Sequence, residues 1–431
     1  MSNKGPSLMG SAVIVGFALF SMLFGAGNII FPPYIGVISG DSWPLAFGAY
    51  FFADIGLAVL AFLAMLASDT ISRFESIFLR MGHLPSRILT GGVILSVCCI
   101  ASPRTATVSY ELGMIPAFGD FGLPIYTGLY FAAVWLFGIK ESKMIDYIGK
   151  YLTPLLVISL VIMIIIAFFN PVGEMSTTPK IDNLWFMGLI SGYQTMDAAT
   201  GCIFGYVIAR DLANKGFKDN QSQISAVVRA SFIMAALMFI VYGGLCYIGA
   251  TASMQYGADV QHGPLVVALF QTILGTTAGI ALGIIVTLAC LTTGIGLTSA
   301  AATFIVNVSG GKIKYNVVFT ALCVFYAFVA NLGLAQILAI AVPVILIIFP
   351  ALVTMTMLSF FNKQITNDNV FRFAVYFALA FAVMEVLHNM YGVTALSFVT
   401  KSPLFAEGFG WILPAVIGGC IGMVVKAKKT A

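Results

Sequence analysis

An interruption in the first apolar stretch constrains this chain more than any other feature. The stretch runs from about Ser11 to Ile38 and is long enough to cross a membrane, yet Gly25-Ala26-Gly27-Asn28 and then Pro32-Pro33 lie inside it. In hydrocarbon every backbone N–H and C=O needs a partner, so unwound backbone survives only where protein or a polar cavity covers it. We therefore expect the interruption to form part of a binding site.

The composition indicates a membrane protein. Of the 431 residues, 60% are hydrophobic and 9% are charged, and the mean hydropathy is +1.01, far beyond an ordinary globular domain. Twelve windows are long and apolar enough to span a bilayer, centred near Gly25, Gly56, Leu95, Ala132, Leu160, Gln194, Leu237, Leu291, Phe325, Ile345, Leu379 and Ile417. We predict an all-α polytopic protein with twelve transmembrane helices in one domain over residues 1–431.

The basic residues predict the orientation. With twelve spans, all 21 Lys and Arg residues except Arg104, Lys180 and Lys401 fall on one side of the membrane, and basic residues gather on the cytoplasmic side. Both termini are therefore expected in the cytoplasm, and the basic loops need no nucleic-acid partner. We expect a polar cytoplasmic loop from Arg210 to about Gln223 and a short helical lid between Thr251 and Gly275.

The seven cysteines all lie in apolar windows and lack the spacing of a disulfide or zinc framework. We interpret them as small core residues: Cys98, Cys99, Cys202, Cys246, Cys290, Cys323 and Cys420.

The sixth window, from about Leu184 to Ala209, also has a polar middle, which runs from Ser191 to Asp197 and is followed by Gly201. An offset of five spans reverses the direction through the membrane, so the first five spans and the next five would form inverted repeats, each opened by a broken helix. The repeats would cover about 11–170 and 181–360, followed by two extra helices over about 370–426. The alternative is that the glycines merely allow close helix packing, but it does not explain the polar side chains at both breaks.

The first break offers two kinds of binding group. The amides of Ala26, Gly27 and Asn28 begin a new half-helix, whose positive dipole end suits a carboxylate. Just before them, the carbonyls of Ser21, Leu23 and Phe24 lose their helical partners and could coordinate a monovalent cation. In the eighth window, the adjacent hydroxyls of Thr292 and Thr293 either bond their own helix or complete an oxygen shell for sodium.

Ionisable residues at membrane depth are functional candidates by default. Asp54 and Glu385 are candidate partners of polar backbone, and Asp197 either neutralises a substrate ammonium or caps the second half-helix. Arg104 and Glu111 lie two helical turns apart on one face, which suggests a gate or a structural ion pair. His388 lies near the end of the eleventh window, where snorkelling explains it better than a proton relay.

Several motifs resemble one known family. The run from Phe17 to Pro33, together with Ser102-Pro103-Arg104-Thr105-Ala106 and Gly192-Tyr193-Gln194-Thr195-Met196-Asp197-Ala198, looks like the signature of the bacterial branched-chain amino acid:cation symporters, the system II carriers. The resemblance covers nearly the whole chain. It implies a multi-pass protein of the bacterial inner membrane.

A more distant resemblance is to the LeuT-type sodium symporters, whose first-helix Gly-x-Gly-Asn and Phe-Pro are similar to Gly25–Asn28 and Phe31-Pro32. It implies a LeuT-like 5+5 fold and a sodium ion held by Ser21, Phe24, Ala289, Thr292 and Thr293. It also implies that the substrate meets the two breaks, at Gly25, Ala26, Gly27, Asn28, Tyr193, Gln194, Thr195 and Asp197. Tyr193 falls near where a second sodium site expects threonine, which leaves a second ion open.

These features predict a cation-coupled symporter, with Na⁺ as the coupling ion and leucine, isoleucine and valine as substrates, that works by alternating access in the lipid bilayer. A proton is the alternative ion, and it could use Asp197. A channel or an amino-acid sensor on the same bundle is the alternative class. We expect no enzyme activity and no cofactor, because no catalytic constellation, metal-ligand spacing or phosphate-binding loop occurs in the sequence.

Overall fold

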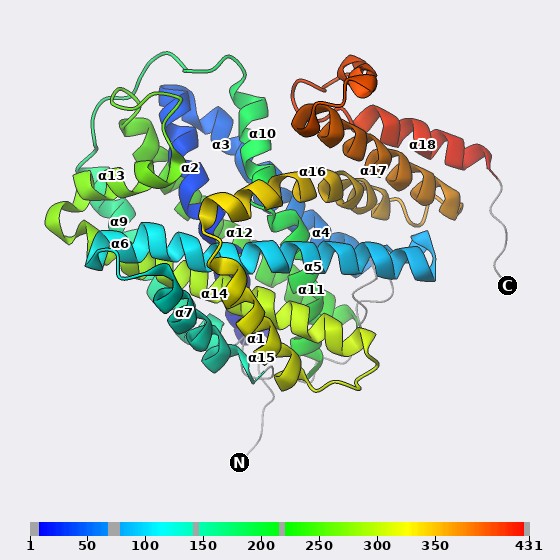
Figure 1. The fold of residues 1–431 in the computed structure, drawn as a ribbon, viewed down its shortest axis with the longest axis horizontal. Coiled ribbons are helices and arrows are strands. Elements are labelled where there is room, and N and C mark those ends of the chain that lie inside the picture. Colours follow the sequence, from blue (N-terminus) through cyan, green and yellow to red (C-terminus); the bar gives the residue numbers. More distant parts are fainter. Residues whose placement is uncertain (1–7, 68–77, 141–145, 215–219, 426–431) are drawn as a thin grey trace.

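The computed structural model describes residues 8–67, 78–140, 146–214 and 220–425, and within these ranges every regular element is a helix (Figure 1). The first half contains α1 (Leu8–Leu23), α2 (Ala26–Ser39), α3 (Trp43–Phe51), α4 (Leu57–Ala67), α5 (His83–Val108), α6 (Ile115–Phe118), α7 (Leu123–Gly138) and α9 (Thr153–Phe169). The second half contains α10 (Leu184–Gln194), α11 (Asp197–Asn214), α12 (Asn220–Thr251), α13 (His262–Leu274), α14 (Ala278–Val308), α15 (Tyr315–Ala330), α16 (Leu334–Ser359), α17 (Asp368–Tyr391) and α18 (Ile412–Val424). Short 3₁₀ or π-helical turns are η1 (Gly40–Ser42), η2 (Phe52–Gly56), η4 (Leu79–Met81), η5 (Ser109–Met114), η6 (Ile148–Leu152), η7 (Gly275–Thr277) and η8 (Thr394–Lys401).

The helices match the apolar windows of the sequence. Eleven of the twelve window centres fall within helical elements, and the first, Gly25, lies in the short break between α1 and α2. Seven segments of the described chain are long and apolar enough to cross a membrane, and five shorter apolar helices accompany them. Large apolar side chains such as Ile162, Phe169 and Phe328 are exposed, as a lipid-facing surface requires. The chain is thus an all-α membrane protein, while the count of twelve spans stays a prediction.

The two interrupted windows pack reciprocally. The first break separates α1 from α2, and both helices pack on α12, which is the seventh window. The second break separates α10 from α11, which pack on α3 and α4 of the second window. Such an exchange is what two inverted repeats would produce. The packing therefore supports the predicted 5+5 arrangement, which remains a prediction.

Glycines allow this close approach. A Cβ on Gly36 of α2 would lie 2.0 Å from the carbonyl oxygen of Cys246 in α12, and one on Gly249 of α12 would lie 1.9 Å from that of Pro33. In the other pair, a Cβ on Gly192 of α10 would lie 2.5 Å from the carbonyl oxygen of Tyr50 in α3. The packing role of glycine therefore holds around the breaks, alongside the role in breaking the helices.

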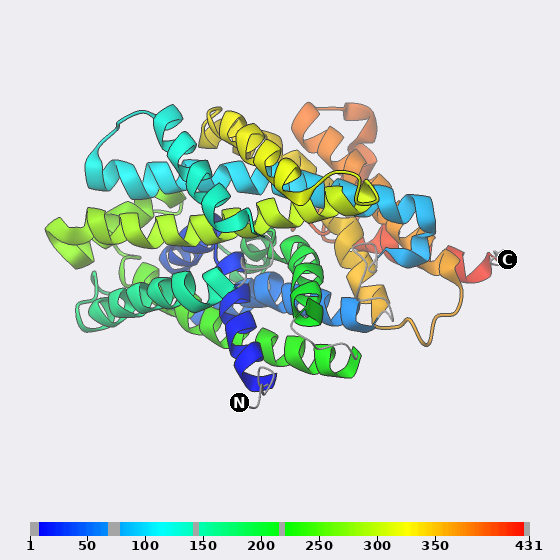
Figure 2. The ribbon, with the colours of Figure 1, turned by 90° about the horizontal axis from the view of Figure 1, so that it is seen from below.

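Two long helices cross the middle of the molecule. α5 and α14 lie side by side in both views (Figures 1 and 2) and pack closely on one another. α14 also packs on α1 and α11, so the two breaks face it from the same side of the bundle. α17 and α18 pack against each other at one edge of the molecule, where α17 also contacts α16.

The expected lid is helical. α13 occupies most of the segment between α12 and α14, and it packs on α2. The ring of His262, at its first residue, lies 4.1 Å from that of Tyr34 and 5.4 Å from that of Phe31, measured between centroids. The hydroxyl of Tyr34 donates to the carbonyl oxygen of Ala258 over 3.0 Å. The segment is thereby attached to the half-helix that follows the first break.

Two expectations need correction here, one for the polar loop and one for the cysteines. The polar stretch from Arg210 to Gln223 is largely helical, because α11 continues to Asn214 and α12 begins at Asn220; residues 215–219 lie outside the described chain. Cys420 is exposed and Cys99 is half-buried, so these two cysteines are not core residues, whereas Cys98, Cys246, Cys290 and Cys323 are buried. The side chain of Cys202 lies outside the described part.

Pro32 and Pro33 do not interrupt the first window, because both lie inside α2. Proline removes one backbone donor and fixes φ near the helical value, so a helix packed on all sides can absorb it. The break itself is shorter than the sequence suggested, since only Phe24 and Gly25 separate α1 from α2.

Candidate functional site

The first break leaves the start of α2 open. Gly25 is the N-cap of α2, with extended backbone at φ −109° and ψ −159°. Its amide donates to Oδ1 of Asn28 over 3.2 Å, so the side chain of Asn28 supports the unwound segment from within the next turn. No side chain caps α2 from the Gly25 position. The amides of Ala26 and Gly27 therefore remain at a free helix N-terminus, as predicted.

The second break lies inside the predicted polar stretch from Ser191 to Asp197. α10 ends at Gln194 and α11 begins at Asp197, and Met196 between them has φ of 72°, which side-chain-bearing residues rarely adopt. The hydroxyl of Thr195 donates to the carbonyl oxygen of Gly192 (2.6 Å) and lies 2.8 Å from Oδ1 of Asp54. Strained backbone of this kind is characteristic of functional sites.

Asn28 connects the two breaks. Its Nδ2 lies 2.7 Å from Oδ2 of Asp197 and 3.4 Å from Oδ2 of Asp54, and it also contacts the hydroxyl of Tyr242. An amide NH₂ has only two protons to donate, so three oxygens compete for it. We call Asn28, Asp54, Thr195, Asp197 and Tyr242 the polar cluster.

Sequence reasoning placed Asn28, Thr195 and Asp197 at a common site but missed Tyr242, which no motif marks. Asp54 was a functional candidate by its depth in the membrane, with a structural role as partner of polar backbone favoured. It belongs to the π-helical turn η2 between α3 and α4, and such turns in membrane helices frequently occur at functional sites. A single carboxylate in an apolar window was the available signal.

The predicted cation-site residues also come together. The hydroxyl of Thr292 lies 2.8 Å from the carbonyl oxygen of Ser21 and 3.0 Å from that of Ala289, and the hydroxyl of Thr293 lies 3.4 Å from that of Ser21. Thr292 also bonds the carbonyl oxygen of Leu288 in its own helix, at 3.0 Å, so the interpretation of a bond within the helix holds, and the oxygen shell for sodium stays a prediction. The group consists of neutral oxygens, which suit a hard monovalent cation better than a transition metal.

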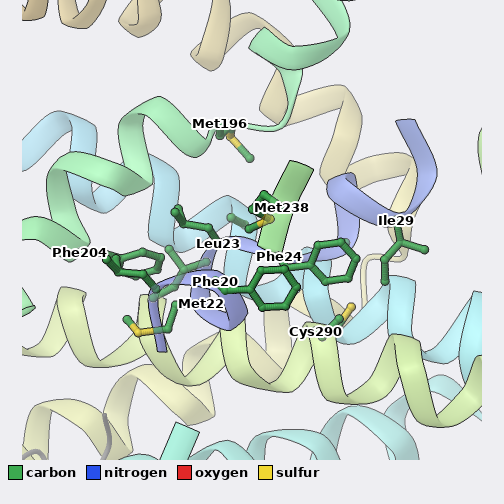
Figure 3. Close-up of a cluster of buried hydrophobic side chains, with 14 of the residues drawn as sticks. Phe20, Met22, Leu23, Phe24, Ile29, Met196, Phe204, Met238 and Cys290 are labelled. Carbon is green, nitrogen blue, oxygen red and sulfur yellow. The ribbon is translucent and has the colours of Figure 1, made fainter. Parts of the chain in front are cut away.

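Buried apolar side chains gather at the breaks, among them Phe24 of the first and Met196 of the second (Figure 3). The rings of Phe20 and Phe24 stack with centroids 5.4 Å apart, just before the first break, and Met196 lies at the second break. Phe24 is fully buried, and its carbonyl belongs to the unwound residues that α14 faces. This surrounding lowers the local dielectric, which strengthens every charge interaction at the breaks.

Two predicted substrate residues point elsewhere. The ring of Tyr193 packs on Phe349 with centroids 3.7 Å apart and lines a cavity of about 240 Å³ that also contacts Glu385 and Trp411. Gln194 is exposed. Because successive helical residues point about 100° apart, Thr195 can face the polar cluster while Tyr193 and Gln194 face away. Neither residue therefore contacts the polar cluster, and the role predicted for them in substrate binding stays a prediction.

Arg104 and Glu111 do not form the expected ion pair, because none of the ion pairs found in the described chain joins them. Glu111 lies by the backbone amide of Leu334, at the N-terminus of α16, where a carboxylate is stabilised. Arg104 instead lies beside the first break, since a Cβ on Gly27 would be 3.6 Å from its Nη2. His388 has a local role, with Nδ1 3.2 Å from the carbonyl oxygen of Val393 at the end of α17.

The site concentrates buried charge. Asp54, Asp197 and Arg104 are the charged residues that are buried in the described chain, with exposed fractions of 0%, 4% and 9%. A lone buried charge is unstable unless it is paired or neutralised. With both carboxylates ionised, the three groups carry one negative charge in excess, which an additional cation or a shared proton would neutralise.

Comparison of the sequence with known proteins gives matches over the whole chain. A family profile described as branched-chain amino acid transport protein matches residues 9–429. The chain is 30% identical to the branched-chain amino acid permease BraB of Bacillus subtilis, over 96% of this chain and 95% of that protein. It is 32% identical to the branched-chain amino acid transport system 2 carrier protein of Pseudomonas aeruginosa, over 95% and 94%, and 30% identical to the permease BrnQ of Escherichia coli K12, over 94% and 93%.

The fold is similar to those of solved transporters. A Na⁺-coupled sialic acid symporter matches with a TM-score of 0.63 and 15% identity, over 97% of this chain and 91% of that one. MhsT in complex with L-phenylalanine matches with a TM-score of 0.56 and 15% identity, over 95% and 97%. At this identity the likeness concerns the fold alone, and it agrees with the LeuT-type architecture expected from the sequence.

Proposed function

Since this chain belongs to the family of branched-chain amino acid transport proteins, we propose that it is a sodium-coupled symporter that imports leucine, isoleucine and valine. Its family and relatives are transport proteins, so the chain is a transport protein and not an enzyme. In the proposed orientation it spans a bacterial inner membrane with both termini in the cytoplasm. Import would proceed by alternating access around the two broken helices.

One contact is the main support for sodium as the coupling ion. The hydroxyl of Thr292 lies 2.8 Å from the carbonyl oxygen of Ser21, which joins α14 to the unwound end of α1 through oxygens alone. A sodium ion between Ser21, Phe24, Ala289, Thr292 and Thr293 would replace these hydrogen bonds with ion–oxygen contacts. Binding would then fix α14 against the first break, which couples the ion to the shape of the substrate site.

The substrate would lie between the breaks. Its carboxylate would meet the free amides of Ala26 and Gly27, where the dipole of α2 is positive. Its branched side chain would enter between α5, α11 and α16 beside Met196, where Val97, Ala199 and Ile345 line an apolar cavity of about 10 Å³ that would have to widen to admit it. One methylene in such a pocket changes binding by only about 1–3 kcal/mol, so three related side chains would share it.

Proton coupling is the second candidate, and the polar cluster favours it. Asp54 and Asp197 are both buried and both accept from Nδ2 of Asn28. A proton shared by the two carboxylates would neutralise the excess charge as effectively as sodium would. The two candidates differ in the residues that carry the ion.

The deciding experiment uses the purified full chain in proteoliposomes. Leucine uptake is measured with an imposed sodium gradient at equal pH, and then with an imposed pH gradient in sodium-free buffer. Uptake driven by sodium alone supports the proposal, and uptake driven only by the pH gradient supports the proton alternative. If neither gradient drives uptake of leucine, isoleucine or valine, both candidates are wrong.

A further inference from the structure

The inference concerns Arg104, in the middle of the molecule. Arg104 lies on α5, and nine-tenths of its surface is buried. Nε of its guanidinium has no hydrogen-bond partner, and no ion pair found in the described chain includes this residue. The guanidinium group stays protonated in proteins and carries five N–H donors. A buried positive group is therefore present without a protein ion-pair partner in the described chain.

Arg104 lies next to the start of α2. A Cβ on Gly27 would make ordinary contacts of 3.6 Å with Nη2 of Arg104 and with Cα of Thr195, so a carboxylate bound beside Gly27 would lie against the guanidinium once these neighbours move slightly apart. The free amides of the first turn of α2 border the same position. Arg104 and the N-terminus of α2 thus present donors to one point between the two breaks.

The available acidic side chains do not fill this role. Asp197 lies close enough to act on Arg104 electrostatically, yet the two form no ion pair, and the carboxylate of Asp197 accepts from Asn28. Glu111, the residue paired with Arg104 in the sequence-based prediction, belongs to η5, and its carboxylate lies by the backbone amide of Leu334 at the start of α16. A gap therefore separates a free guanidinium from a carboxylate. An α-amino acid has the matching charges, with a carboxylate for Arg104 and an ammonium for Asp197.

We propose that Arg104 binds the carboxylate of the transported substrate, together with the amides of Ala26 and Gly27. This inference rests on the proposed transport function and adds the residue that selects the substrate class. A guanidinium can bind a carboxylate through two parallel hydrogen bonds, and such charge-assisted pairs are stronger than neutral ones. The site would then require a free carboxylate and would reject amines, alcohols and amides with the same apolar side chain.

The binding of the substrate carboxylate by Arg104 also fits the transport cycle. When the site is empty, Asp197 acts on Arg104 only from a distance. When substrate arrives, the guanidinium gains a direct partner, and the ammonium of the substrate neutralises Asp197. Arg104 and Asp197 are then each paired across the two breaks, and Asp54 remains for the coupling cation or proton, so substrate binding would join the breaks in the occluded state.

The test begins with the unmodified protein in proteoliposomes. Radiolabelled leucine uptake is competed with leucinol, which lacks the carboxylate, and with 4-methyl-2-oxopentanoate, which lacks the ammonium. The expected result is that the oxo acid competes and leucinol does not. Competition by leucinol without competition by the oxo acid overturns the inference. Because the experiment uses the unmodified protein, its result does not depend on the folding of a variant.

Variants then test the residue itself. Arg104→Gln is expected to raise KM for leucine by about 10- to 100-fold, the worth of a charge-assisted hydrogen bond, and to abolish competition by the oxo acid. Arg104→Lys, which keeps the charge, is expected to restore part of both. The matched control is Arg80→Gln, because Nε of Arg80 pairs with Asp368 over 2.7 Å far from the breaks. This control should lower thermal stability and leave KM unchanged.

A thermal shift on adding sodium reports the cation site in each variant and does not require transport. If Arg104→Gln keeps this shift and also keeps the KM and the competition pattern of the wild type, the role of Arg104 is wrong while the proposed function stands. If the wild type takes up no leucine, the proposed function itself fails.

Discussion

Nδ2 of Asn28 lies 2.7 Å from Oδ2 of Asp197, which joins the two helix breaks across 169 positions of sequence. One hydrogen bond therefore links the first turn of α2 to the first residue of α11. Both groups are buried, so the bond is strong and costly to lose. Any movement that separates the two breaks during transport must break this bond or replace it with contacts to the substrate.

The first prediction follows from that bond. Asn28→Asp keeps the size of the side chain but replaces the donor with a third carboxylate, next to Asp54 and Asp197. The uncompensated charge is expected to lower the free energy of unfolding by about 3–5 kcal/mol and to abolish leucine uptake at neutral pH. Chemical denaturation and uptake assays measure the two effects. Asn170→Asp, at an exposed position after α9, should change neither by more than the assay error.

The second prediction concerns the threonines of α14. Thr292→Val and Thr293→Val remove a hydroxyl and keep the shape, so each is expected to raise the sodium concentration for half-maximal uptake by about 10- to 100-fold. The maximal rate at saturating sodium should fall less. Thr272→Val is the control, since that threonine is exposed on α13 and bonds only its own helix. Unchanged sodium dependence in both α14 variants would contradict the cation site.

The third prediction separates two glycines of the first break. A Cβ on Gly25 would lie 3.0 Å from the hydroxyl oxygen of Thr293, which is too close for an ordinary contact, whereas the nearest atoms to a Cβ on Gly27 lie 3.6 Å away. Gly25→Ala is therefore expected to cost about 1–3 kcal/mol of stability through overpacking and to weaken sodium binding. Gly27→Ala should keep the melting temperature and still lower leucine uptake, because its methyl group enters the space of the substrate carboxylate. Full activity of the folded Gly27→Ala protein would exclude this space as the binding site.

The fourth prediction concerns pH. His262 lies on the lid helix α13, outside the twelve predicted spans, and burial lowers the pKa of its imidazole below the usual 6.5. The folded state therefore holds the neutral form, so its stability is complete above pH 6.5 and declines as the pH falls below that value, where the unfolded chain takes up the proton. The rings of Phe31 and Tyr34 face the imidazole and give it no negative charge.

Acidification from pH 7.5 to 5.5 should accordingly lower the melting temperature of the wild type more than that of His262→Phe. Differential scanning fluorimetry in detergent measures this difference. His388→Phe, at the end of α17, is the histidine control and should retain the pH response of the wild type. An equal response in wild type and His262→Phe would show that the lid contact does not depend on this proton.

Sequence reasoning worked best where local backbone chemistry decides the outcome. The helical break at Gly25 followed from glycine at membrane depth, where unwound backbone needs a covering partner. Ser21 and Thr292 were assigned to one cation site by the resemblance to the LeuT-type symporters. The structure brings the hydroxyl of Thr292 to 2.8 Å from the carbonyl oxygen of Ser21, and the bound ion stays a prediction.

The parts that failed depend on tertiary packing. Tyr242 reaches Asn28 only because α2 and α12 approach closely at Gly36 and Gly249, and no local pattern reports such a contact. Arg104 was paired with Glu111 because both share one helix face, but α16 begins beside Glu111 and takes its carboxylate. Helical spacing indicates which side chains can meet, and the neighbouring helices decide which of them do.

The last prediction concerns the pocket for the substrate side chain. Val97 of α5 lines the small apolar cavity beside the second break and is 5% exposed. Val97→Ala removes two methyl carbons from the wall and enlarges the pocket, so larger apolar substrates should gain relative to valine. The ratio of kcat/KM for phenylalanine to that for valine is expected to rise by about tenfold or more, the effect of one or two methylenes. Val317→Ala, on the exposed face of α15, should leave the ratio unchanged. If Val97→Ala also leaves it unchanged, the side chain of the substrate does not enter this cavity, and its pocket lies elsewhere along the breaks.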